Sequence, residues 1–188
     1  MKKLRQGGFS LIEIMVMTAI VLVIVMVFFG FLGLIAKHDL IFQESNTLTR
    51  GQKALDSYIK KNGFLIVTTG TAPGYTNALA PTRESLIANG LLPSTFPTRS
   101  KFNGQFLFVV RVGVGKNLTG IVCDSGQVQE HAAPSFVLAS AIAAAVPGGV
   151  YTAPDAPSIL VGSGYKDITS PINSAATVCA IASAPSPL

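Results

Sequence analysis

Charged residues are scarce in this chain of 188 residues, at 12%, whereas hydrophobic residues make up 49%. Such a low charge content is unusual for a cytosolic domain, and the apolar content excludes an intrinsically disordered chain. Three of the fourteen basic residues lie within residues 1–8, which leaves eleven basic against nine acidic residues in the remainder. No Lys/Arg cluster with interleaved aromatic residues follows, so nucleic acid is not an expected partner.

Cysteine and histidine are also scarce, at two residues each. Cys123 and Cys179 are 56 positions apart, which excludes a C-x-x-C redox motif. Two cysteines and two isolated histidines are too few for a well-spaced zinc site. In an exported chain an even pair of cysteines predicts one disulfide, and the alternative is two buried free thiols.

No residue pattern for catalysis is present. Gly115 and Lys116 are similar to the end of a phosphate-binding loop, but Val110 and Asn117 occupy the positions where that loop requires Gly and Ser or Thr. A hairpin turn explains this segment better, and no serine has a recognisable His/Asp arrangement around it. We therefore expect no enzyme activity, no catalytic residue, no metal site and no cofactor.

The N-terminal region combines a short basic leader with a long apolar run. Residues 1–8 form the leader, and Glu13 is the one charged residue within residues 9–36. As a helix this run would extend about 42 Å, more than the ~30 Å of a bilayer core. A secretory signal has a shorter apolar region followed by a small-residue cleavage site. The basic leader predicts a cytoplasmic N-terminus and a single pass through the inner membrane.

The helical pattern continues beyond the apolar run but becomes amphipathic. Apolar residues recur at spacings of three, four and seven over residues 37–62, and Asn62-Gly63 predicts the end of the helix. Gly30 and Gly33 lower the helix propensity where the chain would leave the membrane, which permits a bend there. Residues 63–188 are then expected to form a globular head.

Shorter elements are expected in the head. The pattern predicts helices at residues 82–89 and 134–146 and strands at residues 105–112, 118–123, 158–161 and 177–181. A tight Gly-rich turn between the first two strands predicts an antiparallel hairpin. The expected fold class is therefore α+β, with a long N-terminal helix packed on a small antiparallel sheet.

The junction between the leader and the apolar run has its own chemistry. A peptidase that cuts at a membrane surface needs a small, accessible residue before the bond, and Gly8 supplies one. Cleavage would leave a free amine on Phe9, one helical turn before Glu13. Because a lone carboxylate in lipid is costly, we expect Glu13 to pair with a Phe9 amine. If that amine belongs to a neighbouring chain, the pair also sets the stagger between subunits.

This junction resembles the class III leader of the type IV pilin family. The matching order is K-K-…-G-F-S-L-I-E, formed by Lys2, Lys3, Gly8, Phe9, Ser10, Leu11, Ile12 and Glu13. The resemblance implies cleavage by a prepilin peptidase between Gly8 and Phe9, N-methylation of Phe9, and assembly through the N-terminal helix with Glu13 as an assembly residue. The implied partners are other pilin subunits in a homo- or hetero-oligomeric filament, the prepilin peptidase, an inner-membrane assembly platform, and membrane lipid before assembly.

Several placements within and outside that family are open. The two cysteines enclose a segment that looks like the D-region of pilins. Residues 91–96, 103–106 and 147–151 are similar to the constant region of shufflon-type minor pilins. The Phe9 start is more typical of the type IVa side, whereas the Gly-rich head looks more like the type IVb side. A pseudopilin of type II secretion in a periplasmic filament is one alternative to a subunit of an extracellular pilus. Others are a pilus-tip adhesin, a DNA-uptake module and an uncleaved membrane anchor.

Overall fold

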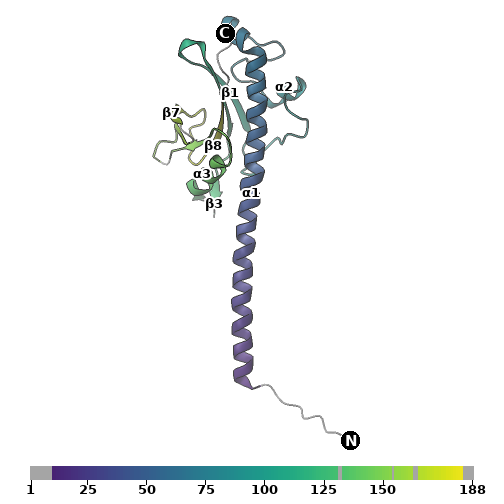
Figure 1. The fold of residues 1–188 in the computed structure, drawn as a ribbon, viewed down its shortest axis with the longest axis vertical. Helices are drawn as coiled ribbons and strands as arrows, with labels where there is room; N and C mark the ends of the chain where they lie inside the picture. Colours follow the sequence, from purple (N-terminus) through teal and green to yellow (C-terminus); the bar gives the residue numbers. More distant parts are fainter. Residues whose placement is uncertain (1–9, 131–132, 154, 163–164, 184–188) are drawn as a thin grey trace. The chain divides into compact units, whose positions relative to one another are not determined.

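The computed structural model describes residues 10–130, 133–153, 155–162 and 165–183. The chain divides into two compact units, Met1–Asp39 and Leu40–Leu188. Helix α1 (Leu11–Thr69) contributes to both units. Among the described residues, the second unit also contains two short α-helices and all the strands (Figure 1). Within the first unit the chain is helical through Gly30 and Gly33, and a Cβ at either position would have no atom within 4 Å.

The part of α1 that lies in the head is longer than predicted. Asn62 and Gly63 do not end the helix, because both are buried inside it and Asn62 Nδ2 donates to Tyr58 O at 3.2 Å. The apolar pattern continues one further turn to Ile66, which is 3% exposed. The helix ends only at Gly70, which has a φ of 70° and donates its N–H to Ile66 O at 3.1 Å. Burial on the head therefore overrides the local stop signal.

A curled antiparallel sheet of six strands is the largest sheet of the head (Figure 1). Its spatial order is β1 (Phe106–Val112), β2 (Leu118–Asp124), β8 (Val178–Ser183), β5 (Gly149–Thr152), β6 (Ile159–Gly162) and β7 (Tyr165–Thr169). A separate two-stranded sheet pairs β3 (Gln129–Glu130) with β4 (Ala133–Pro134). The predicted hairpin is confirmed, because Phe106 pairs with Asp124 and Val112 with Leu118. The strands predicted at residues 158–161 and 177–181 correspond to β6 and β8.

Two short helices begin at side-chain caps. Helix α2 (Arg83–Ala88) begins where Thr82 Oγ1 accepts the Ser85 N–H at 3.2 Å. Helix α3 (Phe136–Ala144) begins where Ser135 Oγ accepts the Leu138 N–H at 3.3 Å. A short polar side chain at this position satisfies a backbone donor that the helix itself leaves unpaired. Both helices lie inside the ranges that the sequence predicts.

The second half of α1 packs closely on one face of the sheet. Leu55 and Tyr58 are 0% exposed, and a Cβ added to Gly120 of β2 would lie 2.7 Å from Leu55 Cδ2. Gly120 therefore permits the close approach of helix and sheet. Alternate residues of β2 enter different clusters, with Val122 in the core against α1 and Ile121 in a second cluster with Val150. The head is thus α+β as predicted, with its sheet burying side chains on both faces.

Candidate functional site

The start of α1 is built around Ser10 and Glu13. Ser10 N–H donates to Glu13 Oε2 at 2.8 Å, and Ile12 N–H donates to Ser10 Oγ at 3.2 Å. The first N–H groups of a helix have no partner inside it, and an S-x-x-E sequence supplies acceptors from both side chains. The Glu13 carboxylate also lies at the positive end of the helix macrodipole. Sequence reasoning missed this role, although the S-x-x-E spacing was a usable signal.

The residues predicted to be processed lie outside the described residues. These are the leader, including Gly8, and Phe9, so cleavage, N-methylation and the pairing of Glu13 with a Phe9 amine stay predictions. Glu13 itself is exposed. Its one hydrogen bond to a described residue engages Oε2, so Oε1 can still accept a donor from outside the described chain. Capping and pairing are therefore compatible roles for this carboxylate.

The helix that follows Glu13 is apolar on every side. Its large hydrophobic side chains between Leu11 and Ile35 are all exposed, from 40% at Val25 to 76% at Leu11. The Thr18 hydroxyl lies 2.9 Å from both Ile14 O and Met15 O, so this polar group is satisfied within the helix. Such a surface is stable only in lipid or against other apolar helices. By length and composition, α1 can cross a membrane once.

The two cysteines form a disulfide at the centre of the sheet. Cys123 of β2 and Cys179 of β8 lie directly opposite one another, their Cα atoms are 4.1 Å apart, and both are fully buried. The bond joins neighbouring central strands, so it ties the β1–β2 hairpin to the remaining four strands. Helix α3 and strands β5, β6 and β7 all lie within the loop that it closes.

The head also contains a pair of buried carboxyl groups that the sequence analysis did not single out. Glu44 of α1 is 2% exposed and its Oε2 accepts the Lys101 N–H at 3.2 Å. Asp124 at the end of β2 is 1% exposed and its Oδ1 accepts the Gly126 N–H at 2.8 Å. Glu44 Oε1 and Asp124 Oδ2 are buried, and neither has a hydrogen-bond partner among the described residues.

This environment disfavours the charged forms of both groups. Burial, the largest cause, and the nearby charge of Asp124 raise the pKa of Glu44 to about 7, against the lowering effect of Lys101. Burial also raises the pKa of Asp124 to about 6, against the lowering effect of the Gly126 N–H and the Ser100 hydroxyl. Glu44 holds the segment before β1 against α1 through the Lys101 N–H, and Asp124 fixes the turn after β2 through the Gly126 N–H. Their role is therefore in the stability of the head and its response to pH.

No family model, curated protein or solved structure matches this chain. Function must therefore be inferred from the residues themselves. The features available are the leader sequence before Ser10, the capped apolar helix, and the disulfide-bonded α+β head. Together they fit a pilin-like architecture, in which α1 is the one helix of the described residues that is long and apolar enough to cross a membrane.

Proposed function

We propose that this chain is a structural subunit of a type IV pilus or a related filament. It is made as a single-pass membrane precursor, cleaved by a prepilin peptidase between Gly8 and Phe9, N-methylated at Phe9 and assembled through α1. The observation that carries the proposal is the helix beginning at Leu11. It begins within the G-F-S-L-I-E sequence, bears one carboxylate in its first turn and exposes its large apolar side chains between Leu11 and Ile35 on all sides.

The helix explains how one subunit serves in two environments. Before assembly, lipid covers the apolar surface between Leu11 and Ile35. During assembly, apolar helices of other subunits replace the lipid. Close helix packing and a polar contact between helices then make the assembled subunit more stable than the subunit in the membrane. Glu13 supplies the polar contact, because Oε2 caps its own helix while Oε1 accepts a Phe9 amine. A paired carboxylate removes the penalty of an isolated charge in an apolar core.

The head occupies the outside of this filament in the proposal. A disulfide between Cys123 and Cys179 forms in oxidising compartments, which agrees with export of the head across the inner membrane. The bond also holds the central strands when the subunit is exposed to the extracellular medium.

Intact and N-terminal mass spectrometry of protein from membranes and from sheared surface filaments tests the proposal. We expect filament protein to begin at Phe9, to carry one added methyl group and to lack the two hydrogens lost on disulfide formation. A chain that begins at Met1 in membranes and is missing from filaments would instead be an uncleaved anchor, and the proposal would fail.

Substitutions in the first turns of α1 separate pairing from capping. We expect Glu13→Val to abolish incorporation into filaments while leaving cleavage after Gly8 largely intact. Thr18→Val is the matched control, because it also makes one exposed position of this helix apolar, and it should assemble normally. Ser10→Ala removes the acceptor of the Ile12 N–H but keeps the carboxylate, so it should assemble too. Normal filament yield from Glu13→Val would refute the pairing.

A further inference from the structure

Strand β1 forms one edge of the six-stranded sheet, and its hydrogen bonds fix which backbone groups face outward. Ser125 N–H donates to Gln105 O at 2.8 Å and Gly113 N–H donates to Asn117 O at 2.7 Å. The backbone N–H and C=O groups of the odd-numbered residues of β1 therefore point toward β2. Backbone groups alternate in direction along a strand. The N–H and C=O groups of Phe106 and Phe108 therefore point away from the sheet.

The outer side of β1 is only partly covered by the protein's own chain. Val110 N–H donates to Leu79 O at 2.7 Å, which closes one end of the edge. Two residues after Leu79, Pro81 has no N–H to donate to the strand. Among the described residues, no partner takes up the outward N–H and C=O groups of Phe106 and Phe108. An unpaired edge of this kind is a template for an added strand.

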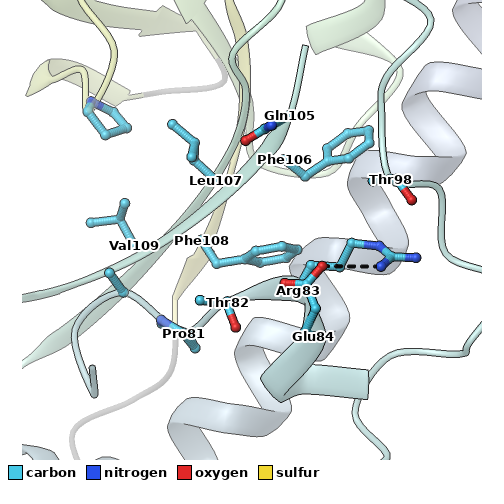
Figure 2. A pocket seen from close by; sticks show the side chains of 12 residues that line it. Pro81, Thr82, Arg83, Glu84, Thr98, Gln105, Phe106, Leu107, Phe108 and Val109 are labelled. Atoms are coloured by element: carbon cyan, nitrogen blue, oxygen red, sulfur yellow. Dashed lines mark hydrogen bonds and ion pairs between the residues drawn. The ribbon is translucent and has the colours of Figure 1, made fainter. Parts of the chain in front are cut away.

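A groove of about 340 Å³ lies along this uncovered stretch (Figure 2). One wall is β1 from Gln105 to Val109, and the other is the segment from Ala80 to Glu84, with Thr98 and Pro171 completing the lining. Figure 2 shows Leu107 and Val109 on one side of the strand and Phe106 and Phe108 on the other. An added strand would therefore meet apolar side chains on both of its faces.

The charges beside the groove cancel one another. Arg83 Nη1 lies 3.3 Å from Glu84 Oε1, and the Arg83 guanidinium also donates to Phe96 O and Pro97 O. The guanidinium and the carboxylate are thus already paired when the groove is empty. A charged occupant would gain no countercharge here, so an uncharged occupant is the complementary one.

We propose that this groove binds an extended, uncharged segment of another polypeptide, which adds to the sheet beside β1. The outward groups of Phe106 and Phe108 supply two donors and two acceptors at the two-residue spacing of a strand, and side-chain contacts come from Leu107 and Val109. The occupant is a single segment, because the groove has β1 as one wall and residues 80–84 as the other. This binding does not depend on filament formation.

The test uses the full-length protein in detergent and a displayed library of uncharged heptapeptides. Enriched sequences are synthesised with capped ends, their affinity is measured by fluorescence polarisation, and amide exchange is followed at Phe106 and Phe108. We expect slowed exchange at these two amides. N-methylation of alternate peptide amides should weaken binding about tenfold or more, because it removes main-chain donors.

A matched pair of variants locates the site. Thr98→Trp fills the groove and should weaken binding about tenfold or more, whereas Thr95→Trp, an exposed threonine of the same loop outside the groove, should leave it within about twofold. The proposal is overturned if no peptide is enriched, if both variants bind alike, or if protection appears away from β1. Self-association of the free protein that Thr98→Trp abolishes would assign the groove to a second copy and overturn it as well.

Discussion

Replacement of Glu44 by Gln should stabilise the head at neutral pH. The carboxyl of Glu44 is 2% exposed, and one of its oxygens has no hydrogen-bond partner among the described residues. In the variant, the amide oxygen still accepts the Lys101 N–H. The amide N–H₂ becomes a donor toward the Asp124 carboxyl, whose charge raises the pKa of Glu44. The substitution therefore removes a buried charge and keeps the shape of the side chain.

The size and pH dependence of the effect follow from the pKa of Glu44. Burial raises it from 4.5 to about 7, which corresponds to about 3 kcal/mol at 1.36 kcal/mol per pKa unit. The folded state then binds more protons than the unfolded state between about pH 4 and pH 7, so the free energy of unfolding falls as pH rises through this range. Asp124, with a pKa raised from 3.8 to about 6, acts in the same direction. The stabilising contribution of protonated Glu44 is complete below about pH 4 and is lost above about pH 7.

Urea unfolding of the full chain in detergent, followed by near-UV circular dichroism, measures this effect. Tyr58 is fully buried in the head and reports its tertiary packing. We expect Glu44→Gln to raise the free energy of unfolding by about 2–3 kcal/mol at pH 8 and to change it little at pH 4. Glu84→Gln, an exposed acid paired with Arg83, should change it by under about 0.5 kcal/mol at both values. A Glu44→Gln variant that is less stable than the parent at pH 8 would refute the reasoning.

Three further changes test other parts of the structure. The double variant Cys123→Ala/Cys179→Ala should lose about 4 kcal/mol of unfolding free energy in urea titrations, because their separation of 56 residues makes a long loop. Gly120→Ala should lower the free energy of unfolding by about 1–3 kcal/mol, since its Cβ would lie 2.7 Å from a leucine methyl of α1. Gly113→Ala, whose Cβ would have no contact under 3.4 Å, should lower it by under about 0.5 kcal/mol. Ser10→Ala should speed amide exchange in the first turn of α1, consistent with loss of about 1 kcal/mol of capping.

Sequence patterns located the elements whose ends are set locally. Thr82 and Ser135 cap α2 and α3 with their own side chains, so both helices could be placed from a few neighbouring residues. The β1–β2 hairpin is similar, because its strands are joined by a short turn that contains Gly113 and Gly115. In each case the decisive interaction connects residues that are close in sequence.

Sequence patterns missed or misplaced the elements that depend on contacts with residues far away in the sequence. β5 begins at Gly149, directly after the turn that ends α3, and it is a strand because it lies between β6 and β8. The stop predicted at Asn62 failed for a related reason. Burial of Ile66 against the head stabilises the helix by more than the low helix propensity of Asn62-Gly63 destabilises it.

The buried carboxyl pair shows why part of a site cannot be predicted from sequence. Glu44 and Asp124 are 80 positions apart, and each occurs in a segment that is compatible with an exposed surface. Only the packing of α1 against the end of β2 brings the two together and leaves an oxygen of each without a partner in the described part of the chain. The same sheet leaves Phe106 and Phe108 with outward backbone groups, because β1 has a neighbour on one side. Both features are produced by tertiary structure, so their chemistry must be tested at the residues that the fold brings together.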